Sequence, residues 1–387
     1  MQNPLVRTVT RFAPLIAAVA AALATLLALL RSQVPVFWIG LAWSAVCAVG
    51  FFAAAKRMTR AVWFNIGAIL LIIGLADAYV GFGDHGPRTR QEFNNSGAFF
   101  VTEPLMGHRP GAGETTTARM YYGDEQIYDV VYTINADGLR ISPPEAPSDP
   151  VRCVLFLGDS YTFGEGVNDQ ETMPYQVGVK AHGQWRVRNF GFSGYGPHHM
   201  LAALETGLVE RAAKCDPKFA IYQAHPHHVT RAAGKWWWDR YGPRYMLQAD
   251  GTVVRHGNFG DAGRPGWMSD LLDQSTLAQR LNDNPTTTPA DVDLFNGIVS
   301  ASRRLLQQRY PGIEFVVLYW NVTDGEVFAR MFTDGSAAGP MTIYPLSKIL
   351  PEWEHMQERY TLPHDVHPNP LAHRIIADYV VDHILPP

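Results

Sequence analysis

The residues with the clearest chemical potential lie at two places far apart in the chain. Ser160 follows an apolar run, a glycine and an aspartate in the stretch "VLFLGDSYTFGEGV". Asp365 and His367 lie in the stretch "LPHDVHPNPLAHRIIA". A serine hydroxyl becomes a nucleophile when a histidine accepts its proton and a carboxylate orients that histidine. These residue types therefore predict covalent catalysis by Ser160, with His367 as the general base and Asp365 as its partner.

The elements around these residues predict how they meet. Apolar runs of strand length alternate with helical patterns from residue 151 onward, which indicates a parallel sheet with helices on both faces. Ligands of such sheets bind beyond the carboxyl ends of the strands, and Ser160 comes just after such an end. Asp365 and His367 are two residues apart, so their side chains project the same way from an extended loop. Asp159 is expected to hold the nucleophile turn by hydrogen bonds.

A third block separates this pattern from a chance G-D-S sequence. "NFGFSGYG" follows the serine by about thirty residues, and "DVHPNPLAH" comes near the end. The order of the three blocks resembles the SGNH/GDSL hydrolases over residues 151–387, and "YTINADGLR" resembles the lead-in of membrane-attached members. The resemblance implies a three-layer α/β/α flavodoxin-like fold, ester chemistry through an acyl-serine intermediate, and no cofactor.

Several roles follow from this resemblance alone. It makes Ser160 the nucleophile, His367 the base and Gly194 an oxyanion donor beside the N–H of Ser160. Many members place the acid three residues before the histidine, which is His364 here, and we favour Asp365. The family's usual oxyanion Asn is absent from "IYQAHPHHVTR", and His227 stands where we expect that Asn.

Two further clusters have open interpretations. His198, His199, His225, His227 and His228 invite a zinc hypothesis, but no carboxylate stands at ligand spacing, so we predict no metal site. "KWWWDRYGPRY" is typical of a sugar-stacking surface and equally of packed aromatic residues. We include four residues as predicted substrate contacts: His228, Arg231, Trp236 and Trp238.

The first 85 residues differ from the rest. Residues 12–30, 34–55 and 61–82 form apolar stretches, of which only the third contains a charged residue, Asp77. A helix needs about 20 apolar residues to cross the bilayer core, so we predict three spans. Arg7, Arg11 and the basic group Lys56, Arg57 and Arg60 place the N-terminus in the cytoplasm by the positive-inside rule. The later domain is then extracytoplasmic, which is the periplasm in a bacterium. Asp77 is interpreted as an interfacial carboxylate.

The remaining sequence sets the domain boundaries. Residues 86–150 combine breaker-rich linkers with a strand pattern, so we predict a small β-containing extension before the domain at 151–387. The net charge of −4 and the absence of a basic stripe exclude a nucleic-acid partner. Cys47, Cys153 and Cys215 lack metal or redox spacing, and we interpret them as small buried apolar residues.

Three functional hypotheses remain open from the sequence. The first is a membrane-anchored serine esterase that acts on an ester, such as the O-acetyl group of a carbohydrate, outside the cytoplasm. The second is an O-acyltransferase of a cell-envelope polysaccharide, which needs a membrane partner to supply the acyl group. The third is a non-catalytic binding or assembly module, suggested by the missing Asn.

Overall fold

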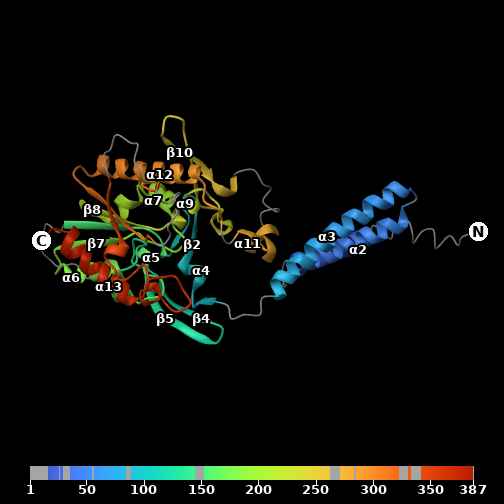
Figure 1. Ribbon diagram of the computed structural model, residues 1–387, viewed down its shortest axis with the longest axis horizontal. Helices are drawn as coiled ribbons and strands as arrows, with labels where there is room; N and C mark the ends of the chain where they lie inside the picture. Colours follow the sequence, from blue (N-terminus) through green and yellow to red (C-terminus); the bar gives the residue numbers. More distant parts are fainter. Residues whose placement is uncertain are drawn as a thin grey trace, which may run out of the picture. The chain divides into compact units, whose positions relative to one another are not determined.

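The computed structural model divides the chain into two compact units (Figure 1). One unit comprises Met1–Gly86 and Gly263–Asn284, and the other comprises Pro87–Ala262 and Pro285–Pro387. The structure describes residues 16–25, 27–28, 35–54, 56–83, 89–143, 152–261, 271–282, 285–321, 330–332 and 341–386.

Two long apolar helices dominate the first unit. Helix α2 covers Pro35–Ala53 and helix α3 covers Arg57–Gly83, and both are long and apolar enough to cross a bilayer. A shorter apolar helix covers Ile16–Thr25. The described residues thus contain two helices of spanning length where we predicted three, because much of the first apolar stretch lies outside them. Gly40 and Gly74 let α2 and α3 approach closely, since a Cβ atom on Gly40 would lie 2.6 Å from the carbonyl oxygen of Leu70.

Asp77 has a different environment from the interfacial one that we predicted. Its carboxylate is buried and accepts hydrogen bonds from the Ser275 hydroxyl at 2.8 Å and from the Leu277 backbone N–H at 3.0 Å. These bonds satisfy the start of helix α11, Thr276–Asn282. The carboxylate of Asp77 is therefore accommodated in an apolar helix because Ser275 and Leu277, about 200 residues later in the chain, donate hydrogen bonds to it.

Antiparallel strands lie in the segment 89–133, where we predicted a small β-containing extension. Strands β1 (Thr89–Phe93), β4 (Thr115–Tyr122) and β5 (Glu125–Thr133) form one sheet, and β2 (Phe100–Glu103) pairs with β3 (Gly107–Pro110). The short helix α4, Ser96–Phe99, brings Phe99 into an aromatic cluster with Tyr132, Phe163 and Phe192. The extension shares this core with the loops that follow the first strands of the main sheet.

The main sheet is parallel, as the alternating pattern predicts. Its five strands are ordered β12-β11-β8-β6-β7, from Thr342–Pro345, Glu314–Tyr319, Pro217–Ala224, Arg152–Leu157 and Trp185–Asn189. Counted along the chain within this sheet, the order is 2-1-3-4-5, which is the flavodoxin-like arrangement. All five carboxyl ends lie at one edge, so residues that follow different strands meet there.

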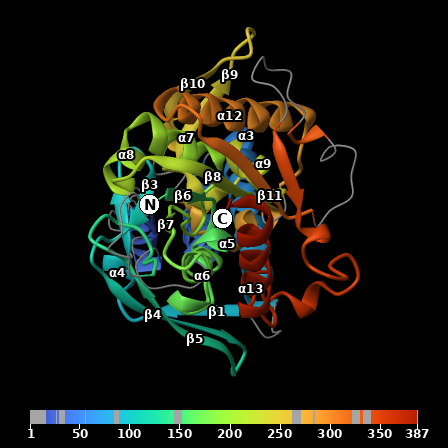
Figure 2. The same ribbon diagram turned by 90° about the vertical axis from the view of Figure 1, so that its left-hand side faces the viewer.

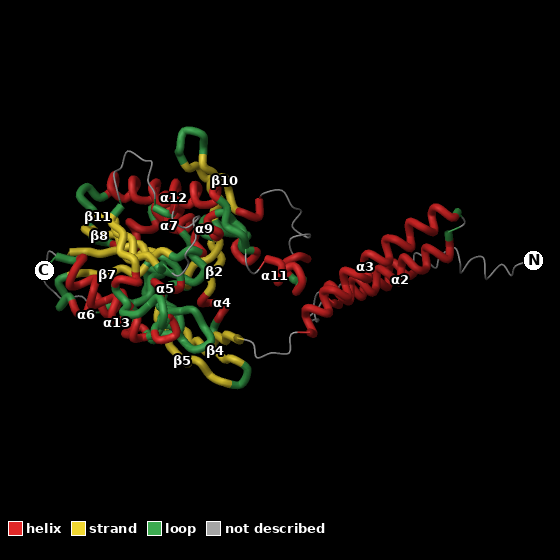
Figure 3. Tube along the Cα trace, viewed as in Figure 1, coloured by secondary structure: helices red, strands yellow, loops and turns green. Residues whose placement is uncertain are grey.

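Helices cover both faces of this sheet (Figure 2). Cys153, Leu155 and Leu157 of β6 face one core, and Val154 and Phe156 face the other. The first core is covered by α7 (Pro197–Glu205), α8 (Leu208–Ala213), α9 (His227–Ala232) and α12 (Pro289–Arg309), and the second by α6 (Met173–Lys180) and α13 (Pro370–Tyr379). A three-layer α/β/α sandwich results (Figure 3).

Shorter elements complete this unit. They are the helix α5, Ser160–Phe163, the hairpin β9 and β10, Pro243–Leu247 and Val253–Asn258, the 3₁₀ turns at Asp169–Glu171, Trp237–Asp239, Phe259–Asp261, Leu346–Lys348 and Gln357–Arg359, and a π-helical turn at Val380–Ile384.

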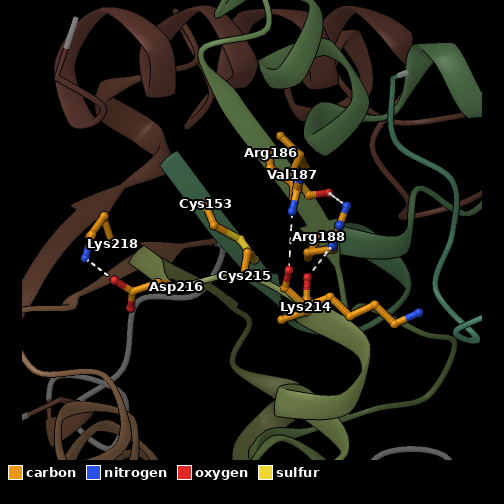
Figure 4. The surroundings of a disulfide bond; sticks show 9 residues. Cys153, Arg186, Val187, Arg188, Lys214, Cys215, Asp216 and Lys218 are labelled. Carbon is orange, nitrogen blue, oxygen red and sulfur yellow. Dashed lines mark hydrogen bonds and ion pairs between the residues drawn. A yellow bond between two sulfur atoms is a disulfide. The ribbon is translucent and has the colours of Figure 1, made fainter. Parts of the chain in front are cut away.

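A disulfide joins Cys153 to Cys215, contrary to our prediction that both are small apolar residues (Figure 4). Cys153 lies in β6, and Cys215 precedes β8, which pairs with β6. Parallel pairing brings the starts of the two strands together, so the Cα atoms lie 6.2 Å apart despite a sequence separation of 62. Nothing in the local sequence reveals this proximity, because it arises from strand order. Cys47 remains a free, buried cysteine.

Candidate active site

Ser160 begins helix α5 directly after strand β6. Gly158 is required at this turn, because its φ is +154° and a Cβ atom there would lie 2.2 Å from the Thr162 hydroxyl oxygen. Asp159 caps the short helix by accepting a hydrogen bond from the backbone N–H of Tyr161 at 3.1 Å. The turn thus fixes the backbone of the serine tightly, and the Ser160 side chain is held at the carboxyl edge of the sheet.

The three predicted catalytic residues lie in one hydrogen-bonded line. The Ser160 Oγ atom is 2.8 Å from His367 Nε2, and the opposite ring nitrogen, Nδ1, is 2.9 and 3.0 Å from the two carboxylate oxygens of Asp365. Nδ1–H donates to Asp365, which leaves the Nε2 lone pair for the serine proton. This geometry matches the requirement for a serine nucleophile with an oriented base.

Asp365, rather than His364, is the residue that contacts His367 Nδ1. His364 is an exposed residue with φ +54°, and its ring stacks on Tyr122 with the centroids 3.9 Å apart. Burial favours the neutral form of Asp365, but the hydrogen bond and the charge of His367 outweigh it and lower the pKa of the carboxyl. His373 is buried and accepts the Met173 N–H, as expected for a packing residue.

His367 is surrounded by negative charge. Burial opposes its protonation, but the charge of Glu165 and the hydrogen bond and charge of Asp365 raise the pKa of His367 to about 9. The ring of Tyr161 packs beside it, with centroids 5.3 Å apart. The charged imidazolium form of His367 is therefore favoured over the neutral form at neutral pH.

His228 and Arg231 hold the nucleophile turn through Asp159. The carboxylate of Asp159 lies 2.8 Å from Arg231 Nη1 and 3.0 Å from His228 Nε2. Burial alone would raise the pKa of Asp159, but the charges of His228 and Arg231 hold it well below its usual range. His228 is fully buried, so its predicted contact with substrate does not match its position. Arg231 also donates to the Tyr195 carbonyl oxygen at 2.8 Å, which likewise gives it a structural role.

The two other predicted oxyanion donors, Gly194 and His227, come from different segments. Gly194 has φ +78°, and a Cβ atom there would lie 2.9 Å from the Trp238 ring. His227 is exposed at the start of α9, its ring stacks on His225 with centroids 4.7 Å apart, and its edge meets Trp236. Although the residue is exposed, partial desolvation of its ring and the charge of Arg231 lower the pKa of His227, which favours a neutral ring that can donate one N–H. Its oxyanion role stays a prediction.

The tryptophans divide between packing and exposure. Trp236 is half-buried and donates its Nε1–H to the Thr230 hydroxyl at 2.9 Å. Trp238 lies against Gly194 and is 36% exposed, and the guanidinium of Arg231 lies over its ring. Trp238 therefore presents an aromatic surface beside the predicted oxyanion loop, while Trp236 is bound to helix α9 through Thr230.

Arg140 secures the segment that follows the nucleophile helix. Its fully buried guanidinium donates to the carbonyl oxygens of Phe163 at 2.8 Å and Val167 at 2.7 Å, and it pairs with Asp169 at 2.9 Å. The motif "YTINADGLR" thus supplies Arg140, which binds the extension to the loop after helix α5.

From the sequence we did not identify Glu165, which lies between two glycines of that loop, or its partners Ser193 and Gln91. The only sequence signal for Glu165 was its place in "TFGEG".

Metal-ligating residue types also gather near the site. Among the described residues, atoms of His108, His199 and Asp239 lie within 4.8 Å of one another. The Gly196 N–H donates to His199 Nδ1, which places the ring proton on Nε2, 3.6 Å from an Asp239 oxygen. His198 Nε2 is 2.8 Å from the other carboxylate oxygen. Asp239 thus supplies a carboxylate near these imidazole rings that we did not recognise in the sequence, and the absence of a metal site stays a prediction.

Several solved structures are similar to this chain. No family model matches it, and no curated protein sequence matches it. Solved structures that match include a lipolytic protein of the G-D-S-L family from Desulfitobacterium hafniense, with a TM-score of 0.35 and 10% identity over 59% of this chain and 97% of that chain. An acetyl xylan esterase from the rumen bacterium Butyrivibrio proteoclasticus matches with a TM-score of 0.33 and 13% identity over 78% of this chain and 84% of that chain. At TM-scores this low, we base the function on the geometry of the site.

Proposed function

We propose that this protein is a serine esterase that removes acyl groups from a carbohydrate on the extracytoplasmic side of a membrane. The observation that carries this proposal is the hydrogen-bonded line from Ser160 through His367 to Asp365, with 2.8 Å between Ser160 Oγ and His367 Nε2. That line lies at the carboxyl edge of a parallel sheet, where ligands of such folds bind. A non-catalytic module has no need for a base aligned on a serine hydroxyl.

The proposed reaction has two steps. Ser160 Oγ attacks the ester carbonyl carbon while its proton passes to His367 Nε2, and the C–O bond to the leaving alcohol breaks as His367 returns that proton to it. Water then attacks the acyl-serine, with His367 again as base, and releases the acid. The N–H groups of Ser160 and Gly194, with His227 as the third donor, are proposed to stabilise the oxyanion.

A carbohydrate substrate is favoured by the aromatic surface beside the oxyanion loop. Trp238 is partly exposed and lies directly against Gly194, so a sugar ring that carries the scissile ester can pack on it. Arg231 and His227, which lie beside Trp238 and Trp236, are polar groups that suit a ligand rich in hydroxyl groups.

Two independent features support the extracytoplasmic location. The Cys153–Cys215 disulfide is of the kind that persists in oxidising compartments. Lys56 lies in the connection between α2 and α3, and Arg57 and Arg60 lie in the first turn of α3, which favours the cytoplasmic side for this connection. If both helices cross the bilayer, the chain leaves α3 on the opposite side, where the residues from Pro87 onward then reside.

The decisive experiment compares the full chain in detergent with its Ser160→Ala variant. We expect Ser160-dependent hydrolysis of a chromogenic acetate ester and of acetylated xylo-oligosaccharides, and covalent labelling of Ser160 by a phosphonate. Equal turnover by both proteins would rule out the esterase proposal. Labelling without hydrolysis, followed by acetyl transfer to an added glycan, would instead identify the O-acyltransferase that the sequence leaves open.

A further inference from the structure

Glu165 is a second carboxylate beside His367, on the side opposite Asp365. Its Oε2 atom lies 4.0 Å from His367 Nε2, whereas Asp365 contacts Nδ1. The Glu165 side chain is 11% exposed, so solvent screens its charge weakly. His367 therefore lies between two acidic groups, and one of them is close to the nitrogen that exchanges protons with Ser160.

Three separate segments hold Glu165 in this place. The Ser193 hydroxyl donates to Oε2 at 2.6 Å, and the Gln91 amide donates to Oε1 at 2.9 Å. The Glu165 backbone N–H donates to the carbonyl oxygen of Ser160 at 2.9 Å. Gln91 belongs to β1 of the extension, and Ser193 precedes the predicted oxyanion donor Gly194. These bonds occupy both carboxylate oxygens and keep Glu165 near Nε2 without a direct hydrogen bond to it.

We propose that Glu165 is a supporting carboxylate of the catalytic centre, which stabilises the imidazolium of His367 from the Nε2 side when Ser160 attacks. This inference rests on the proposed function, in which the Ser160 proton moves to His367. The proton stays on Nε2 until the leaving alcohol takes it, and Glu165 neither accepts it nor forms a bond to the substrate. Its contribution is electrostatic, in a site where burial strengthens such interactions.

Other charged groups near His367 do not replace this contribution. Asp365 acts on Nδ1, and the charge of Asp159 is matched by its contacts with Arg231 and His228. Tyr161 presents only its ring. Burial of His367 disfavours the charged ring, and the charge of Glu165 opposes this effect and raises the pKa of His367, together with the hydrogen bond and the charge of Asp365.

The proposal has a specific kinetic consequence. Below the pKa of His367, both the resting enzyme and the transition state contain the imidazolium, so the contribution of Glu165 to kcat/KM cancels. Above this pKa, the resting ring is neutral and Glu165 favours only the transition state. Removal of the negative charge of Glu165 should therefore leave kcat/KM unchanged at acid pH and lower it at alkaline pH. A merely structural role would lower the rate at every pH.

The test uses the full chain in detergent with Glu165→Gln, which retains the shape but removes the charge. Asp250→Asn is the matched control, because it removes one charge from the exposed turn between β9 and β10. We expect the kcat/KM profiles of Glu165→Gln and the unmodified chain to coincide near about pH 6 and to separate at alkaline pH by about tenfold or more. A uniform loss at all pH values, or a profile like that of the control, would overturn the proposal.

A second measurement separates this inference from the esterase proposal. The titration midpoint of His367 is followed by NMR of histidine-labelled protein, with the signal assigned by His367→Gln. We expect Glu165→Gln to lower the midpoint by about one unit or more, and Glu165→Asp, which keeps a charge, to restore much of the shift. An unmoved midpoint would refute the role of Glu165 even if esterase activity is found. A lowered midpoint in a protein without Ser160-dependent hydrolysis would refute only the esterase.

Discussion

The Oγ atom of Ser160 and the Nε2 atom of His367 lie 2.8 Å apart, although 207 residues separate them in the chain. Ser160 is fixed by the end of β6, and His367 is fixed by a closed loop before α13. In that loop the Leu362 N–H donates to the His367 carbonyl oxygen, and the Asn369 N–H donates to Tyr360, each at 2.9 Å. Two rigid anchors thus bring nucleophile and base together, and this pairing leads to several testable consequences.

Activity should rise with pH up to about 9. The base must be neutral to accept the Ser160 proton, and the pKa of His367 is raised to about 9 by Glu165 and Asp365 against the effect of burial. Below that value the neutral fraction falls about tenfold per pH unit, so we expect kcat/KM at pH 7 to be about 100-fold below its plateau. The check is the Ser160-dependent rate from pH 6 to 10. A flat profile above pH 7 would contradict the raised pKa.

Asp365→Asn should reduce kcat far more than it reduces stability. An amide in place of the carboxylate can donate to Nδ1, which favours the tautomer with the proton on Nε2 and removes the acceptor for the serine proton. We expect a loss of about 10⁴-fold in kcat, as for other triads, and a small change in Tm. His364→Ala is the control, since His364 is exposed and stacks on Tyr122. A larger loss from His364→Ala would reverse the assignment of the acid.

Gly194→Ala should impair both folding stability and catalysis. The residue has φ +78°, and the added Cβ atom would lie 2.9 Å from Trp238, so the N–H that we assign to the oxyanion must move. We expect a loss of about 1 to 3 kcal/mol in unfolding free energy from the backbone strain, and at least about a tenfold loss of kcat. Gly251→Ala provides the matched control, because Gly251 has φ +80° with open space around it. If both variants lose kcat equally, Gly194 has no special role in the reaction.

Removal of the disulfide should destabilise the second unit. Cys153 and Cys215 close a loop with a sequence separation of 62, which corresponds to about 4 kcal/mol in the chain-entropy account. We expect a clear fall in Tm for the Cys153→Ala/Cys215→Ala double variant and for the unmodified chain with dithiothreitol. Under non-reducing denaturation, alkylation should label Cys47 alone. Labelling of all three cysteines in protein purified from its membrane would argue against an oxidising compartment.

Much of the architecture was predictable because it depends on local patterns. Alternating strands and helices indicated a parallel sheet, and the apolar β6 followed by Gly158 indicated where Ser160 emerges. The predicted pairing of Asp365 with His367 needed only two neighbouring side chains on one loop. Hydrophobic periodicity and turn chemistry act over a few residues, so they leave a readable trace in the sequence.

The helices were less predictable where a single residue interrupts a pattern. The segment 198–214 has one continuous amphipathic pattern, yet α7 and α8 are separated at Gly207, which adopts φ +69°. The long apolar stretches could be recognised in the sequence. The hydrogen-bond partner of Asp77 could not, because Ser275 lies 198 residues away. Such contacts depend on how distant segments pack.

The sequence by itself predicted Ser160, His367 and Asp365 as the catalytic residues, the strand that ends just before Ser160, and the apolar character of the first unit. Only the tertiary structure decided which groups meet. Strand order brings Cys153 next to Cys215. His228 and Arg231, which we predicted to contact substrate, contact Asp159. Hydrogen bonds from Gln91 and Ser193 hold Glu165 near His367 Nε2. Burial and charge act through distance in space, and spacing along the chain does not record that distance.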